Sequence, residues 1–155
     1  MVVAPDPGNS RLIHATAIAL DGRAALLMGP SGAGKSDLAL RCLMLEARDG
    51  GLPLRAVLVA DDQVRLELQN GSLNCLSPPT IAGHLEVRGL GIMRMPFVAS
   101  ARVVLAVRLA SNSPIERMPD PATLEILGCT IPEIRLSPFE ASAPAKLLLA
   151  LARST

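Results

Sequence analysis

The stretch "LLMGPSGAGKSDLAL", Leu26–Leu40, decides which fold this chain can adopt. It fits the pattern Gly-x-x-x-x-Gly-Lys-Ser, and the fixed positions fall on Gly29, Gly34, Lys35 and Ser36. The apolar run before the pattern is typical of a buried strand, and the apolar spacing after it is typical of a helix. A glycine-rich turn between a strand and a helix predicts a loop that binds phosphate groups.

The residue types in this turn suit that chemistry. Glycines let backbone amides curl around an anion, and the N-terminus of the following helix adds partial positive charge. Lys35 is one of only two lysines beside thirteen arginines, and its compact ammonium can reach the β- and γ-phosphates of a bound ligand. The Ser36 hydroxyl is expected to ligate the Mg²⁺ that bridges those phosphates. The complete set of residues expected to contact the nucleotide is Gly29, Pro30, Ser31, Gly32, Ala33, Gly34, Lys35 and Ser36.

Length and composition exclude several classes of protein. A chain of 155 residues is long enough for one domain and too short for two ordinary ones, so residues 1–155 are predicted to form a single domain. The formal net charge is +1 without a run of like charges, which does not indicate binding to nucleic acid. The apolar runs are shorter than the roughly 20 residues of a membrane span, and the N-terminus does not resemble a signal peptide. We therefore expect a cytoplasmic protein that does not bind membranes.

Apolar patterning outlines the remaining elements of an α/β fold. Strands are expected at residues 14–20, 24–28, 56–60 and 102–109, with shorter alternating pieces at 64–68 and 84–89. Helices are expected at residues 36–47, before the breaker "RDGGLP", and at 146–153. The proline-rich stretches 113–122 and 130–145 are expected to be loops or edges.

A second part of a phosphoryl-transfer site follows from "RAVLVADD", an apolar strand that ends in Asp61 and Asp62. A carboxylate at the C-terminal end of such a strand faces the phosphate loop, where it can hold Mg²⁺ or orient a nucleophile. Two adjacent carboxylates also repel, so one of them can have the raised proton affinity that suits a general base. The alternative interpretation is a solvated turn after the strand.

Three further polar residues are weaker candidates when each is taken alone. They are Glu86 in "HLEVRGLG", His14 before the phosphate-loop strand, and Arg117 in the loop "PIERMP". A residue of these types is more often a surface group or a satisfied polar side chain than a catalytic one.

The motifs taken together resemble a known family. "MGPSGAGKSDLAL", "VLVADDQV" and "LEVRGLGIM" are similar to the phosphate loop, the double aspartate and the signature segment of the bacterial HPr kinase/phosphorylases. The third stretch discriminates best, because phosphate loops are shared by very many families. The resemblance covers roughly residues 14–95 and continues through "IERMP" to "KLLLALA". It implies a mixed sheet like that of the phosphoenolpyruvate carboxykinase-like kinases.

The resemblance also implies an activity and its machinery. Members of this family transfer phosphate from ATP to a serine of HPr, the small carrier protein of the sugar phosphotransferase system, and reverse the modification with inorganic phosphate, releasing pyrophosphate. His14 would be the family's catalytic histidine, and Lys35 would take its phosphate-binding role. One of Asp61 and Asp62 would act as base in the kinase direction and as acid in reverse, and the resemblance favours Asp62. Ser36 would be a magnesium ligand.

Further implications concern the rest of the chain. Glu86 would be the second magnesium ligand, residues 88–95 would be tied to dephosphorylation, and Arg117 would match the family's mobile-loop arginine. The resemblance predicts a short, catalytic-domain form that assembles as a homo-oligomer, a hexamer, and binds HPr. Two other functions stay open: a small-molecule kinase of the phosphate-loop class, for which a longer arginine-rich lid would be expected, and a nucleotide-sensing module without turnover.

Overall fold

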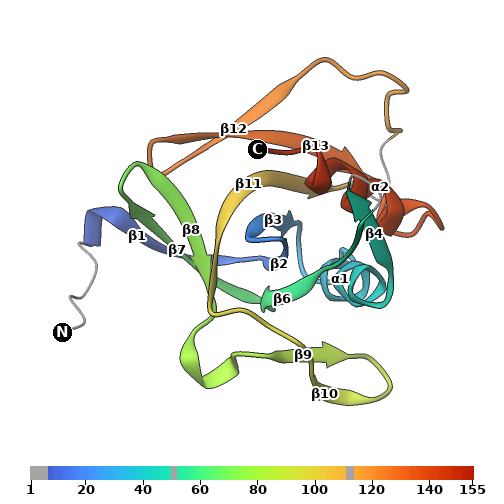
Figure 1. Cartoon of the computed structure of the whole chain (residues 1–155), viewed down its shortest axis with the longest axis horizontal. Helices are drawn as coiled ribbons and strands as arrows, with labels where there is room; N and C mark the ends of the chain where they lie inside the picture. Colours follow the sequence, from blue (N-terminus) through green and yellow to red (C-terminus); the bar gives the residue numbers. More distant parts are fainter. Residues whose placement is uncertain (1–6, 50–51, 111–113) are drawn as a thin grey trace.

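A curled mixed β-sheet with two helices against it forms the body of the protein (Figure 1). The structure is a computed structural model that describes residues 7–49, 52–110 and 114–155. The strands of the large sheet are β1 (Ser10–His14), β2 (Thr16–Leu20), β3 (Arg23–Met28), β6 (Val57–Ala60), β7 (Gln63–Gln69), β8 (Ser72–Leu76), β11 (Ser100–Leu109), β12 (Ala122–Ile126) and β13 (Cys129–Leu136). They lie in the order β1-β7-β8-β11-β3-β2-β6, and β13 extends the sheet from β11 to β12.

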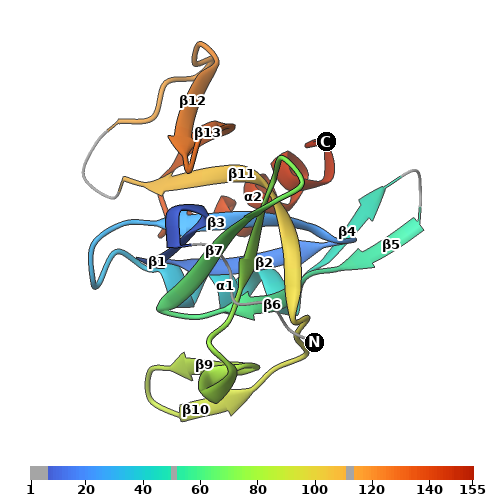
Figure 2. The same cartoon turned by 90° about the vertical axis from the view of Figure 1, so that its left-hand side faces the viewer.

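Two hairpins project from this sheet, as Figure 2 shows from the side. One pairs β4 (Glu46–Asp49) with β5 (Leu52–Arg55), and the other pairs β9 (His84–Val87) with β10 (Gly91–Arg94). The helices are α1 (Lys35–Met44) and α2 (Ala143–Ala152), and two short 3-10 turns lie at Pro7–Asn9 and Pro79–Ile81. No helix within the described residues is long and apolar enough to cross a membrane.

Three parallel strands fix where the site can lie. β11 runs parallel to β3 on one side and parallel to β13 on the other, whereas the remaining pairs in the large sheet are antiparallel. The carboxyl ends of β3, β13 and β11 therefore meet at one edge, where α/β proteins bind their ligands. The backbone N–H of Ala110 donates to the carbonyl of Leu136 at 2.9 Å and holds two of these ends together.

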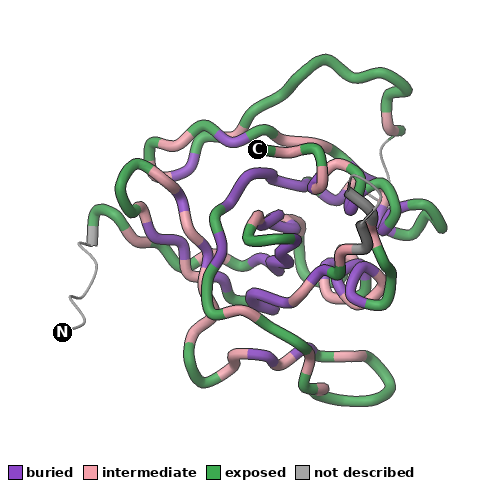
Figure 3. Tube along the Cα trace, viewed as in Figure 1, coloured by how far each residue is buried: buried purple, intermediate pink, exposed green. Residues whose placement is uncertain are grey.

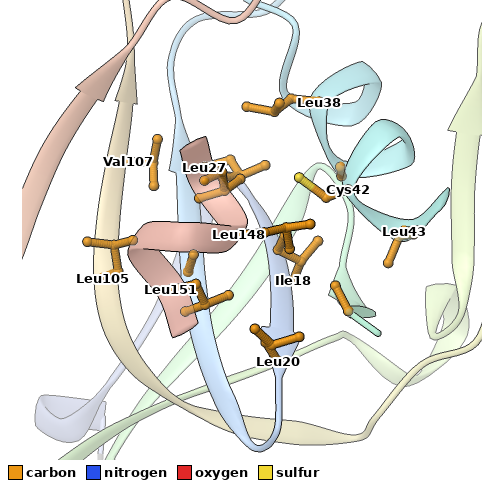
Figure 4. Close-up of a cluster of buried hydrophobic side chains, with 14 of the residues drawn as sticks. Ile18, Leu20, Leu27, Leu38, Cys42, Leu43, Leu105, Val107, Leu148 and Leu151 are labelled. Carbon is orange, nitrogen blue, oxygen red and sulfur yellow. The ribbon is translucent and has the colours of Figure 1, made fainter. Parts of the chain in front are cut away.

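Alternation along the central strands builds a core on each face of the sheet. In β2, Ile18 and Leu20 point toward the helices, while Ala17 and Ala19 point to the opposite face, as the period of two residues in a strand requires. Figure 4 shows the helical side, where α1 and α2 pack against the sheet. Its labelled members are Ile18, Leu20, Leu27, Leu38, Cys42, Leu43, Leu105, Val107, Leu148 and Leu151.

The opposite face is covered by the sheet itself. Small alanines of β2 and β3 lie there against side chains of β7, β8, β12 and β13, such as Leu66 and Ile131, because the curled sheet leaves little room for larger residues. Figure 3 shows buried residues concentrated in the central strands and the helices, with the β9–β10 hairpin mostly exposed or half-buried. The phosphate loop thus starts from the most deeply buried part of the molecule.

The predicted α/β class and mixed sheet are confirmed, and so is the strand that precedes the phosphate loop. The single strand predicted for residues 14–20 is wrong, because the chain changes neighbours at Ala15. Residues before it pair with β7, and residues after it pair with β3 and β6. The resulting break places His14 at the end of β1, directly opposite Gln63.

Two other predictions are wrong because the segments concerned pair with other strands. The helix predicted to extend to residue 47 ends at Met44, because Glu46 pairs with Arg55 in the β4–β5 hairpin and cannot stay helical. The stretch 130–145, expected to be a loop or an edge, holds most of β13, which lies between β11 and β12. Its proline, Pro132, is tolerated because pairing with β11 begins one residue later, at Glu133.

Candidate functional site

The phosphate loop connects β3 directly to α1. Gly32 and Gly34 have φ angles of 82° and 96°, a left-handed conformation that favours glycine. At Gly29 a Cβ atom would lie 2.9 Å from the Cβ of Ala33, so any side chain would clash with the loop itself. The backbone N–H of Ala33 donates to the carbonyl of Pro30 at 3.0 Å and closes the turn. The glycines predicted from the motif are therefore required by the shape of the loop.

Lys35 is the first residue of α1, and its side chain turns back along the phosphate loop. Its residue is only 6% exposed, and its Nζ donates to the carbonyls of Gly29 at 2.7 Å and Pro30 at 2.9 Å. Burial lowers the pKa of Lys35, although the charges of Asp62 and Asp61 act in the opposite direction. The ammonium is thus fixed within the loop between the backbone and the carboxylates.

Asp61 is buried beneath the loop with both carboxylate oxygens engaged. Its Oδ1 accepts from the Ser36 hydroxyl at 2.6 Å and from the Thr16 hydroxyl at 3.0 Å. Its Oδ2 accepts from the backbone N–H of Glu86 at 3.1 Å. One carboxylate therefore ties together the first turn of α1, strand β2 and strand β9. Such fully satisfied polar groups fix a site in one geometry.

Asp62 has the opposite environment, although it is the next residue. Its φ of 68° lies in the left-handed region, which aspartate tolerates better than most residues, and this turn between β6 and β7 directs its side chain outward. The side chain is 65% exposed, and its Oδ1 lies 3.1 Å from Nδ1 of His14. The backbone of the same turn is held by Ala15, whose N–H donates to the Asp62 carbonyl at 3.2 Å.

These groups line one cleft of about 580 Å³. Its lining residues are His14, Ser31, Gly32, Gly34, Lys35, Ser36, Asp37, Leu40, Asp62, Glu86, Val87, Arg88 and Phe139. The structure therefore brings His14, Lys35, Ser36, Asp62 and Glu86 together, with Asp61 directly behind Ser36. Arg117 is exposed in the segment before β12 and is not among the lining residues, so its role stays a prediction.

Sequence reasoning missed two residues that shape this cleft. Thr16 is completely buried and donates to Asp61, but a lone threonine in an apolar strand gives no signal of that contact. Phe139 lies on the loop after β13, in the stretch 130–145 that was expected to be a loop or an edge. Phe139 could have been noticed in the sequence, because the chain has only two phenylalanines and no tyrosine or tryptophan.

The oxygen atoms of Ser36 and Glu86 suit Mg²⁺, which needs few protein ligands, better than a metal ion whose ligands all come from the protein. No group of three or more His, Cys, Asp or Glu side chains in the described part of the chain is arranged to hold a metal ion. Mg²⁺ usually takes one or two protein ligands and completes its shell with phosphates and water. Ser36 donates its proton to Asp61, so its oxygen lone pairs remain free for a hard cation, and Glu86 lines the same cleft.

A phosphate loop at the carboxyl edge of a mixed sheet, with a strand-end carboxylate behind its serine, places the chain among the phosphate-loop α/β proteins. Comparison with known proteins narrows this class. The family described as HPr Serine kinase C-terminal domain matches residues 8–154, and the chain belongs to this family.

Individual relatives agree with the family assignment. An HPr kinase/phosphorylase of Bordetella petrii is 30% identical over 155 aligned residues, which cover 92% of this chain and 47% of the relative. One from Clostridium tetani is 35% identical over 96 residues, 62% of this chain and 28% of the relative. The chain thus spans about half the length of these relatives or less. A solved structure of the Hpr(Ser) kinase/phosphatase from Coxiella burnetii superposes with a TM-score of 0.72 at 25% identity, covering 90% of this chain and 87% of that one.

Proposed function

We propose that this chain is an ATP-dependent kinase that phosphorylates a serine of HPr. The observation that carries the proposal is the pairing of the exposed Asp62 with His14 in the cleft that the phosphate loop also lines. The names of the relatives supply the substrate, since the matching proteins are HPr kinase/phosphorylases.

The residues of the cleft suggest how each would act. The loop amides and Lys35 would bind the phosphates of ATP and stabilise the charge that develops during transfer. Asp62 would accept the proton of the seryl hydroxyl while the new O–P bond forms and the bond between the γ-phosphorus and the bridging oxygen breaks, leaving ADP. His14 would keep the Asp62 carboxylate oriented, because its Nδ1 lies 3.1 Å from Oδ1.

Mg²⁺ fits the oxygen donors described above and would be held by Ser36 and Glu86. When bound, it would neutralise charge on the transferred phosphate and orient it. Asp61 would act behind it, because its hydrogen bond with Ser36 fixes the hydroxyl that serves as ligand. The inner aspartate would therefore position the site, while the outer one would move the proton.

The remaining features of the proposal follow the family. Residues 1–155 would act as one catalytic domain in the cytoplasm, assembled as a hexamer. The phosphorylase reaction would use inorganic phosphate to attack phosphoserine and release pyrophosphate, with Asp62 returning its proton to the serine. Residues 88–95 would contribute to this reverse direction, and Arg117 would serve as the family's mobile-loop arginine.

Labelled ATP and purified HPr from the same cell test the proposal directly. We expect label to appear on HPr when Mg²⁺ is present and to be absent from an HPr variant whose target serine is replaced by alanine. Adding inorganic phosphate to phosphorylated HPr tests the reverse reaction by release of pyrophosphate. Turnover of ATP onto a small molecule instead of HPr, or binding without any turnover, would contradict the proposal.

A further inference from the structure

Phe139 is an exposed aromatic residue that stands against the phosphate loop. It is 63% exposed, and it lines the cleft from the loop between β13 and α2. A Cβ atom at Gly34 would lie 3.1 Å from Cε1 and Cζ of this ring. Single exposed apolar side chains are common on protein surfaces. This ring, however, lies beside the backbone that is positioned to hold phosphates.

The backbone on either side of Phe139 is tied to both helices. Arg41 of α1 donates to the carbonyl of Pro138, and to the carbonyl of Glu140 at 3.3 Å. Lys146 of α2 binds the Glu140 carboxylate at 2.8 Å. The ring is therefore carried by a turn that is fixed at both neighbouring residues. Because the backbone on both sides of the ring is already held, stacking of a planar ligand on Phe139 would need to order little beyond the side chain itself.

The position of Phe139 in the sheet order indicates what would reach it. Phe139 follows the carboxyl end of β13, whereas Asp61 and Asp62 follow β6, and the phosphate-loop strand β3 lies between these two sides. A nucleotide held by the loop must extend its nucleoside toward one side. The β6 side carries the Asp62 and Glu86 carboxylates and must admit the acceptor serine. The nucleoside would therefore extend toward the other side of the cleft, where Phe139 lies.

We propose that Phe139 is the platform on which the base of the phosphoryl-donor nucleotide stacks, and that Arg41 is the residue that positions this platform. The inference rests on the proposed function in two respects, namely that a nucleotide is the donor and that the acceptor serine enters beside Asp62. It adds the place of the base, which determines how the cleft distinguishes a nucleotide from a bare polyphosphate.

The test compares two ligands that share the phosphates and differ in the nucleoside. Dissociation constants for ATP and for inorganic tripolyphosphate, both with Mg²⁺, are measured by calorimetry on the full chain. Loss of base stacking is expected to weaken ATP binding by roughly tenfold or more in Phe139→Ala, with tripolyphosphate binding unchanged. Phe139→Tyr keeps a planar ring and should retain ATP affinity, whereas Phe139→Leu keeps apolar area without the ring and should lose most of it.

Two further variants complete the design. Arg41→Ala should reproduce the selective loss of ATP affinity in weaker form, because the ring remains but its backbone is released. Leu149→Ala removes an exposed apolar residue of α2 that does not line the cleft, and it should change neither constant.

The outcomes separate this inference from the proposed function. If Phe139→Ala weakens both ligands equally, the ring only shapes the phosphate loop, and the inference is overturned. It is also overturned if ATP binding is unchanged while the KM for HPr rises, which would assign the ring to the acceptor. A wild-type protein that binds ATP through Phe139 but never phosphorylates HPr would uphold the inference and contradict the proposed function.

Discussion

The β6 side of the cleft holds two adjacent carboxylates in opposite environments. Asp61 lies in a buried region, where two hydroxyls and one backbone amide donate to it. Asp62 lies in the open region of the cleft, 65% exposed, with His14 as its neighbour. The left-handed φ of 68° at Asp62 turns its side chain away from the core, while Asp61 stays among its partners from α1, β2 and β9.

This contrast suggests which aspartate can do which kind of work. Three donors hold the two carboxylate oxygens of Asp61 in one orientation, and this ties the carboxylate to its neighbours. Asp62 is exposed at the open part of the cleft beside His14, where a seryl hydroxyl from solution can reach it. Asp61 is thus suited to hold the site in shape, and Asp62 is suited to proton transfer. Separate substitutions of the two residues test this division.

The largest effect on catalysis is expected for Asp62→Asn. Asparagine keeps the shape and tolerates the left-handed backbone, but it cannot accept the seryl proton. Single-turnover transfer to HPr should fall by roughly 10²–10⁴-fold, while ATP affinity and the free energy of unfolding change little. Asp120→Asn, an exposed carboxylate outside the cleft, serves as the control. Transfer at the wild-type rate in Asp62→Asn would remove this residue from the mechanism.

Lys35→Met tests the cation that interacts with both carboxylates. Loss of its charge should remove on the order of 3 kcal/mol of transition-state stabilisation. The rate of phosphoryl transfer should then fall by about a hundredfold or more, although the variant still folds. Burial lowers the pKa of Lys35 below 10.5, so the unfolded chain holds this proton to higher pH than the folded protein does. The wild type should therefore gain stability relative to the variant as pH rises from the lowered pKa toward 10.5. If the free energies of unfolding of the wild type and of Lys35→Met change in parallel across that pH range, the lowered pKa of Lys35 would be contradicted.

The sequence predicted the phosphate loop and the strand-end aspartates because both depend on local rules. A loop between a strand and a helix needs glycine where φ is positive, and such glycines appear in the sequence as a motif. The different surroundings of Asp61 and Asp62 could not be predicted in this way. They depend on β1, β2 and β9, which are distant in sequence and bring Thr16, His14 and the Glu86 amide to the two carboxylates.

Two other segments were predicted less well, because strand pairing decided their structure. The β4–β5 hairpin replaces the end of a predicted helix because Glu46 pairs with the next strand, and β13 occupies a proline-rich stretch because it pairs with β12 and β11. Phe139 belongs to this part of the chain. Its position at the cleft depends on β13 ending next to α1, which no short stretch of sequence specifies.

Asp61→Asn is expected to have an intermediate effect, on the metal and not on the chemical step. Asparagine has only one oxygen for three donors, so the Ser36 hydroxyl would lose its fixed orientation. The Mg²⁺ concentration for half-maximal activity should rise by roughly 10–100-fold, as for other groups that orient a metal ligand. Transfer at saturating Mg²⁺ should stay close to the wild-type rate. A rate defect that saturating Mg²⁺ does not relieve would make Asp61, and not Asp62, the candidate base.

The smallest effect is expected for Thr16→Val, which removes one donor from the inner carboxylate and keeps the shape of a completely buried side chain. The free energy of unfolding should fall by about 1 kcal/mol, measured by urea denaturation, because Asp61 loses one of its hydrogen bonds. Thr16→Ser keeps the hydroxyl and should cost less. Combining Thr16→Val with Asp61→Asn should cost less than the two single losses added together, since both remove the same contact. If the losses in the free energy of unfolding add strictly, Thr16 stabilises β2 without acting through Asp61. The orientation of the Asp61 carboxylate would then depend on Ser36 and the Glu86 amide alone.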